Sequence, residues 1–186
     1  FYTMRNNYFQ TTGNHRKDSA MKLIQQIMLL LRISAAPDSV SEYQGETPVK
    51  IMTALEMVAQ WPDEMVAIGV RHKVVLDSYV KAFQTYLPDR PLFVVTGSTT
   101  SFAKRRALRD KLRNSRNGVL LCTQQSLPSS VNFEFVNKVL IPELHYNNSG
   151  MSQFYMRFIR YTSKNFKDIY FLTYLGSIEC NQLQMV

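Results

Sequence analysis

Residues 65–95 read MVAIGV, RH, KVVLDSYVKAFQTYL, PDRP and LFVV, and this stretch decides the fold. The first and last of these runs are continuously apolar, which is typical of strands that are buried on both faces. Between them, residues 73–87 carry apolar side chains at helical spacing. A strand, a helix and a second strand in this order predict two parallel strands joined by a crossover helix.

The same alternation continues on both sides of this unit. Downstream we predict strands at 118–122, 138–141 and 169–174, and helices at Ser101–Arg113, Ser149–Arg160 and from Ser177 onward. Upstream we predict helices at Asp18–Ile33, with Asp18 as N-cap, and at Val49–Gln60, ended by Pro62. The fold class is therefore α/β, with a parallel sheet covered by helices on both faces and one or two helices before it.

The chain divides into a helical extension with a loop (1–48) and the sheet-containing domain (49–186). It begins without Met and ends inside a predicted helix, so we expect a fragment of a longer protein. No run of about 18 apolar residues is present, so we expect no membrane partner. Cys122 and Cys180 have neither zinc-site nor disulfide spacing, and we expect a reducing compartment.

The basic residues are clustered, in a chain of net charge +8. Residues 104–116 hold seven cations against the single acid Asp110, and a second group consists of Arg157, Arg160, Lys164 and Lys167. Such clusters suit a polyanion, either nucleic acid or nucleotide phosphate, although a solvated helix face is the alternative. Ligands of parallel sheets bind where strands end, which here is near Arg71, Thr96, Thr123 and Pro142.

Gln153, Arg157 and Arg160 have a spacing that places all three on one face of the predicted helix. Two guanidinium groups on one face can bind phosphate, since arginine offers forked donors and stays charged. A bare spacing of this kind also occurs on ordinary basic helices.

Several blocks resemble the carboxyl-terminal helicase lobe of superfamily 2 ATPases, and most closely Swi/Snf-type DNA translocases. The blocks follow the family's order over roughly residues 20–183. They are the L-R-x-x-x-x-P segment (Leu29–Pro37), the helix-opening Lys50, motif IV (Val66–Val70), the G-S-T turn (Val95–Thr100) with Arg105 or Arg106, motif V (Leu121–Phe133), Tyr146-Asn147 in place of Trp-Asn-Pro, and motif VI (Gln153, Arg157, Arg160).

The resemblance implies a RecA-like second motor lobe of an ATP-dependent translocase or helicase-like enzyme. Arg160 would be the arginine finger at the γ-phosphate of ATP, Arg157 its neighbour, and Gln153 would couple the helix to the nucleotide. Thr96, Gly97, Ser98, Thr123, Asn132 and Arg71 would meet the nucleic-acid backbone. ATP with Mg²⁺ would be held by the N-terminal ATPase lobe of the same polypeptide. Duplex DNA is the implied nucleic acid, in the cytoplasm of a bacterium or of a phage-infected host.

The chain departs from this family in three places. Leu127, Pro128 and Ser130 replace the glycine-rich part of motif V, Asn148 replaces the proline of Trp-Asn-Pro, and Ser163 replaces the last Gln of motif VI. These changes indicate a divergent branch, viral or phage, or a weaker coupling to DNA. Compact spacing between the motifs favours a bacterial or phage enzyme.

The chain contains no G-x-x-x-x-G-K-[ST] phosphate loop and no D-E-x-H box. We therefore expect the chain alone to bind ATP weakly, to hold no metal and to be inactive. The alternative function is a non-catalytic nucleic-acid or protein binding module derived from a helicase lobe. The residues leave open DNA or RNA, strand separation or translocation, direction, pathway and oligomeric state.

Overall fold

Five parallel strands form one sheet in the computed structural model, which describes residues 14–98, 101–127, 131–145, 148–161, 163 and 165–184. The strands are β1 (Val66–Val70), β2 (Leu92–Val95), β3 (Val119–Thr123), β4 (Lys138–Ile141) and β5 (Asp168–Phe171). Their order is β2-β3-β1-β4-β5, so β1 lies in the centre. The register pairs Val66 with Val119 and with Lys138. The carboxyl ends of the strands therefore meet at one edge.

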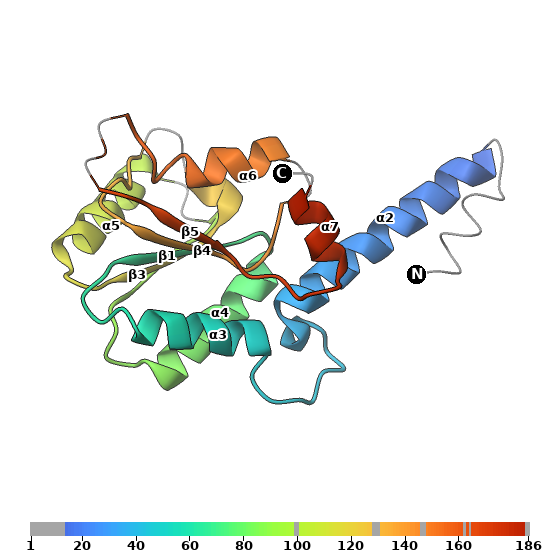
Figure 1. Ribbon diagram of the computed structural model, residues 1–186, viewed down its shortest axis with the longest axis horizontal. Helices are drawn as coiled ribbons and strands as arrows, with labels where there is room; N and C mark the ends of the chain where they lie inside the picture. The colour runs from blue at the N-terminus through green and yellow to red at the C-terminus, as the bar shows by residue number, and fades with distance from the viewer. Residues whose placement is uncertain are drawn as a thin grey trace.

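Helices cover both faces of this sheet, as the sequence predicts (Figure 1). The helices α3 (Val49–Ala59) and α4 (Lys73–Tyr86) lie on one face, and α5 (Phe102–Asn114) and α6 (Asn148–Tyr155) lie on the other. Short 3₁₀ turns occur at Pro37–Ser39 (η1) and Gln124–Ser126 (η2). The three-layer α/β prediction is confirmed.

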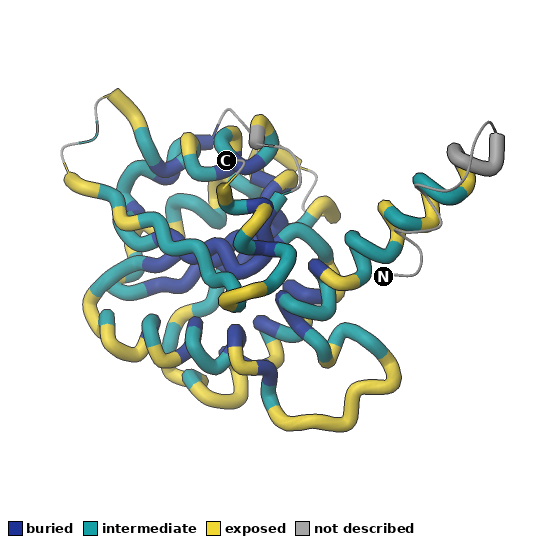
Figure 2. The backbone as a smooth tube through the Cα atoms, turned by 45° about the vertical axis from the view of Figure 1, so that its right-hand side comes forward, coloured by how far each residue is buried: buried dark blue, intermediate teal, exposed yellow. Residues whose placement is uncertain are grey.

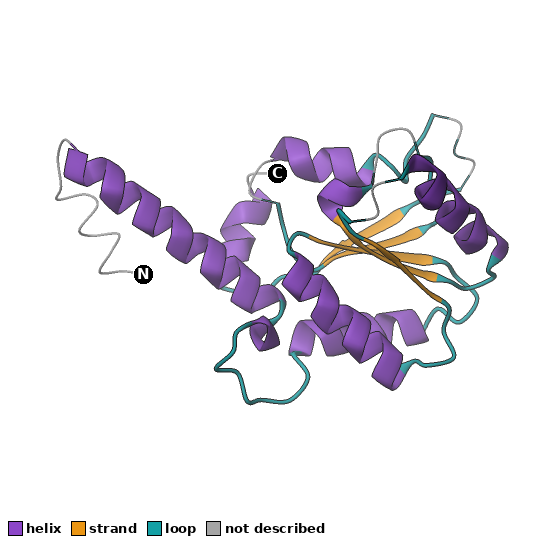
Figure 3. Cartoon of the chain, turned by 180° about the vertical axis from the view of Figure 1, so that it is seen from behind, coloured by secondary structure: helices purple, strands orange, loops and turns teal. Residues whose placement is uncertain are grey.

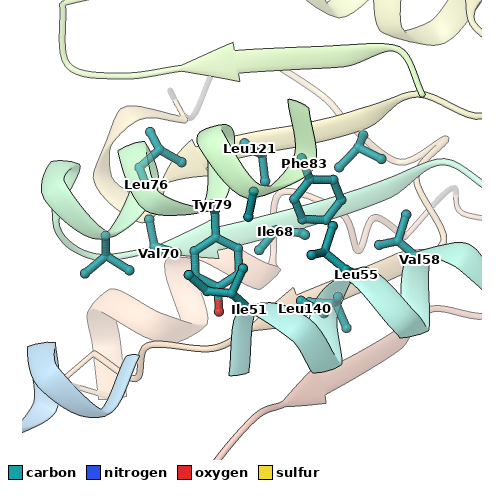
Figure 4. Packing of buried hydrophobic residues seen from close by; sticks show 14 of the residues in the cluster. Ile51, Leu55, Val58, Ile68, Val70, Leu76, Tyr79, Phe83, Leu121 and Leu140 are labelled. Carbon is teal, nitrogen blue, oxygen red and sulfur yellow. The ribbon is translucent and has the colours of Figure 1, made fainter. Parts of the chain in front are cut away.

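Alternate residues of the central strand supply two separate cores. Val66, Ile68 and Val70 pack against α3 and α4 on one face, together with Tyr79 and Phe83 (Figure 4). Ala67 points to the opposite face, where the second core forms around α6. Successive side chains of a strand point to opposite faces, so a continuous apolar run serves both layers.

Gly69 lets α6 approach the sheet. A Cβ atom at this position would lie 2.1 Å from the ring of Phe154, which is buried in the second core. Any side chain on Gly69 would therefore push α6 outward.

The long helix α2 (Asn14–Ala35) precedes the sheet and extends away from it (Figure 3). Only its end is anchored: Leu31, Ala35 and Ala36 are buried, whereas Met21 and Ile24 are more than half exposed (Figure 2). None of the helices in the described residues has the length and hydropathy needed to cross a membrane.

A buried ion pair links the end of α2, the start of α3 and the last helix of the described chain. Lys50 Nζ lies 2.5 Å from Glu179 Oε1 and donates to the carbonyl of Pro142 at 3.0 Å. Ser34 Oγ, at the end of α2, donates to the same carboxylate at 2.7 Å. Glu179 belongs to α7 (Ile178–Gln184), so its carboxylate joins α2, α3 and α7, and Lys50 adds the segment after β4.

Some predicted boundaries are wrong. Asp18 is inside α2 and does not cap it, because the helix begins at Asn14. The strand predicted at 169–174 ends at Phe171, since its pairing with β4 ends at Ile141. Ser101 does occupy the N-cap position of α5, but its side chain makes no capping hydrogen bond.

Candidate functional site

An open groove of about 470 Å³ lies at the carboxyl ends of β1, β2 and β3. Because these three strands are parallel neighbours, the loops that leave them converge there. Three cations and several hydroxyl groups line the groove: Arg71 and Lys73 after β1, Thr96, Gly97 and Ser98 after β2, Arg105 on α5, and Thr123, Gln125 and Ser126 after β3.

The hydroxyl groups of the groove are paired at its two sides. Thr96 Oγ1 and Ser98 Oγ are 2.6 Å apart, and Thr123 Oγ1 is hydrogen-bonded to Ser126 Oγ. A hydroxyl group has one O–H donor and two acceptor lone pairs, so in each pair one hydroxyl uses its only donor on the other. Cations together with hydroxyl donors fit the oxygen atoms of phosphate.

A buried carboxylate fixes the Arg71 side of the groove. One oxygen of Glu143 accepts hydrogen bonds from the backbone N–H groups of Arg71 (2.6 Å) and His72 (3.0 Å). Its other oxygen contacts Nδ1 of His72. Glu143 is 1% exposed, and it lies two residues after the end of β4. It therefore holds the loop after β1 from the segment that follows the neighbouring strand β4.

The opposite side of the groove is tied to the same residue. The Gln124 amide donates to the backbone carbonyls of Gly69 (3.1 Å) and Glu143 (2.6 Å). Gln124 is buried between the groove-lining residues Thr123 and Gln125. The ends of β1, β3 and β4 thus form one hydrogen-bonded unit beneath the groove.

Motif VI differs from its predicted geometry. The helix α6 ends at Tyr155, so Gln153 lies on the helix, whereas Arg157 lies in the turn after it and Arg160 in the following loop. The prediction of one helix from Ser149 to Arg160, with three side chains on one face, is wrong.

Aromatic packing ends this helix. The backbone N–H groups of Arg157 and Phe158 bond to carbonyls three residues back, which tightens the last turn. Phe158 is fully buried against Phe154 (5.4 Å between ring centroids) and Phe133 (6.2 Å). The carbonyl of Arg157 accepts from Phe133 N at 3.3 Å, so it no longer serves a helix.

The two arginines still influence each other. Partial burial, and then the positive charge of Arg160, lower the pKa of Arg157. The loop that carries Arg160 is closed by Ser163, whose Oγ accepts from Arg160 N (3.1 Å) and whose N–H donates to Arg160 O (2.9 Å). Two cations held near one another in this way could share an anionic ligand.

The remaining predicted residues lie elsewhere. Asn132 does not line the groove: its side chain accepts from Glu134 N at 2.9 Å, next to the residue that bonds Arg157 O. Lys167 points inward, donating to Glu134 O and, at 2.7 Å, to Asn137 Oδ1. Lys164, Tyr146, Asn147 and the motif V residues Pro128 and Ser130 lie outside the described residues.

Solved structures share this fold, whereas no protein-family model and no curated protein matches the chain. The Sulfolobus solfataricus SWI2/SNF2 ATPase C-terminal domain matches with a TM-score of 0.66 at 17% identity, over 98% of this chain and 74% of that one. This chain has the fold of a RecA-like helicase lobe. The lobe also matches the core of the same ATPase in complex with dsDNA (TM-score 0.68, 18% identity, 99% of this chain and 39% of that one).

The C-terminal part of the Fun30 ATPase domain is similar as well, with a TM-score of 0.62 at 21% identity. That match covers 80% of this chain, and the lobe spans 50% of the Fun30 chain.

The sequence prediction missed several parts of the groove. Lys73 could have been found, since it is a cation three residues after the end of a predicted strand. Glu143 also directly follows Pro142, where a strand end was predicted. Gln124 and Ser126 also follow a predicted strand end, but their positions at the groove depend on the 3₁₀ turn η2. Within the described ranges, no group of three or more His, Cys, Asp or Glu side chains could hold a metal ion.

Proposed function

We propose that this lobe is the second motor lobe of an ATP-dependent translocase that moves along duplex DNA. The groove carries the proposal, because it places Arg71, Lys73 and Arg105 beside hydroxyl donors at the strand ends of a helicase-type fold. Such contacts hold a phosphate backbone without reading its sequence. The similar Sulfolobus solfataricus core has been solved with dsDNA, which supports this ligand class.

Arg157 and Arg160 supply the catalytic part of the proposal. ATP, held with Mg²⁺ by a partner lobe of the same protein, would provide the γ-phosphoryl group. Arg160, exposed on its loop, would stabilise the charge on that group, and Arg157 would bind beside it. Gln153, one helical turn from Ser149 and bonded to its hydroxyl at 3.4 Å, would steady the end of α6.

The test replaces the arginine finger in the full-length protein, first lobe included. Arg160→Ala should lower DNA-stimulated ATP hydrolysis by about a thousandfold or more, which is the usual contribution of an arginine finger. Arg116→Ala is the matched control, since this arginine is 85% exposed and pairs with Asp63 before β3 begins. Wild-type hydrolysis in Arg160→Ala would show that the finger assignment is wrong.

A non-catalytic nucleic-acid module is the second candidate, favoured by one observation: α6 ends before both arginines. In that case the groove alone would be functional. Arg71→Gln would then weaken DNA binding, while the full-length protein would hydrolyse no ATP above background with or without DNA. A flat response of DNA affinity to salt would contradict both candidates, because each relies on phosphate contacts.

A further inference from the structure

The helix α5 is the most basic element of the lobe, and Arg105 is the only one of its residues that lines the groove within the described chain. Leu112 is its one fully buried side chain, and Leu108 is half-buried on the same face. Lys104, Arg106, Lys111 and Arg113 are exposed. These exposed cations take no part in packing the helix on the sheet, so they are accessible to a ligand.

The cations of α5 form two rows. At about 100° per residue, Arg106, Arg109 and Arg113 lie along one flank of the helix, and Lys104 and Lys111 lie along the other, about 170° away. Both rows flank the exposed ridge, opposite the buried Leu112. The ridge between them carries the exposed residues Ala103, Ala107 and Asn114, together with the half-buried Asp110.

Only one of these cations is neutralised within its own helix. Arg109 donates to Asp110 Oδ1 through Nε (2.9 Å) and Nη2 (2.6 Å), which offsets the single acid of the ridge. Among the described residues, no ion pair forms at Lys104, Arg106, Lys111 or Arg113. A net charge of about four thus remains along the two flanks, a density that attracts a polyanion.

We propose that α5 lies in the major groove of duplex DNA, with one cation row contacting each strand. The proposal rests on the nucleic-acid function proposed above and extends its interface from the groove at the strand ends. An α-helix with its side chains is about 10–12 Å wide, and the major groove of B-DNA is about 12 Å wide. The small side chains of Ala103 and Ala107 let this part of the helix backbone approach the base edges without reading them.

Continuity with the groove supports this arrangement. Arg105 belongs to α5 and also lines the groove, so a phosphate backbone bound there passes the start of α5. Phe102, the first residue of the helix, is 54% exposed on the same flank as Arg106. It offers an apolar contact to base edges at this end.

The geometry also selects DNA over an RNA duplex. The major groove of A-form RNA is deep and narrow, and side chains cannot read it. A helix with cations on both flanks would meet the two backbones of B-DNA together, but only the outside of an RNA duplex.

The test measures binding of the full chain to a 30-base-pair DNA duplex, and to an RNA duplex of the same sequence, over a range of NaCl concentrations. Lys104→Gln/Lys111→Gln removes one row, and Arg106→Gln/Arg113→Gln removes two members of the other. Lys22→Gln/Lys81→Gln removes the same charge from exposed positions on α2 and α4. For DNA, each row variant should make the slope of log affinity against log salt shallower by about 1.8, or about 0.9 per phosphate contact.

The control should change the DNA slope by much less, and the row variants should change RNA-duplex binding no more than the control does. The proposal is overturned if the row variants change the DNA salt slope no more than the control does. It is also overturned if only one of the two rows affects DNA binding, or if the row variants weaken DNA and RNA binding equally. Arg71→Gln, measured in parallel, separates the two proposals. If it weakens DNA binding while the row variants do not, α5 is excluded and the groove stands; if only the row variants weaken binding, the groove assignment fails.

Discussion

Glu143 shows at the residue scale how one buried carboxylate can position a binding surface. It accepts both N–H groups of the loop that carries Arg71, and its own carbonyl accepts from Gln124 on the other side of the groove. An uncompensated buried carboxylate is costly, so its hydrogen bonds specify one loop conformation. The backbone of Arg71 is therefore positioned by a residue that follows another strand, β4.

Glu143→Gln should weaken DNA binding as much as Arg71→Gln does. A glutamine has one acceptor oxygen in place of two, so its NH₂ group must face either the two backbone N–H groups or Nδ1 of His72. Each variant should make the salt dependence of duplex binding shallower by about 0.9, and the double variant should change it no further, because both act through one contact.

Glu179→Gln is the control for the Glu143 and Arg71 variants, because Glu179 is also a buried carboxylate but does not line the groove. It should lower stability and leave the salt dependence unchanged. Additive losses in the Glu143→Gln/Arg71→Gln double variant would contradict the positioning role.

The helix α6 shows at the element scale why sequence spacing alone is insufficient. Helical periodicity continues through Arg160, but the chain leaves the helix after Tyr155 because Phe158 is buried against two other rings. Phe154 of the same aromatic cluster packs directly over Gly69 of β1 and so brings α6 close to the sheet. The position of Gln153 and of the arginines after it thus depends on how closely α6 packs.

Gly69→Ala should lower the free energy of unfolding by about 1–3 kcal/mol, the usual cost of overpacking a core. The added methyl group would meet the Phe154 ring at 2.1 Å. Gly97→Ala is the control, because the nearest heavy atom to its new Cβ would be Ser126 Oγ at 4.0 Å. Urea unfolding measures both variants.

A Gly69→Ala/Phe154→Ala variant should be destabilised by less than the sum of the two single changes, since removing the ring makes room for the methyl group. Strict additivity would mean that the two residues do not press on each other.

At the scale of the whole molecule, the Lys50–Glu179 ion pair links α3 with α7, two helices that are far apart in the sequence. Burial lowers the pKa of Lys50, whereas its hydrogen bond and charge interaction with Glu179 act in the opposite direction. The ring of Tyr174 lies 5.1 Å from the ammonium group, and Tyr174 N donates to Glu179 at 3.1 Å. Removing one partner leaves the other charge buried without its counter-ion.

Glu179→Leu should cost about 3–5 kcal/mol of stability, the usual result of breaking a buried pair from one side. Lys50→Met/Glu179→Leu should recover part of this loss, since apolar side chains can replace a buried pair. Urea unfolding measures the energies, and hydrogen exchange should show α7 losing protection in Glu179→Leu. A double variant less stable than Glu179→Leu would contradict this account.

The sequence by itself determined the layer order, the parallel strands and the strand ends where Arg71, Thr96 and Thr123 converge. Continuous apolar runs and crossover helices carry that information locally. Tertiary structure alone decided the buried contacts of Gln124 with Glu143 and of Lys50 with Glu179, the hydrogen bonds of Lys167 to Glu134 and Asn137, and the early end of α6. Each of these features depends on a partner residue that is distant in sequence. The spacing of side chains along one segment therefore cannot predict it.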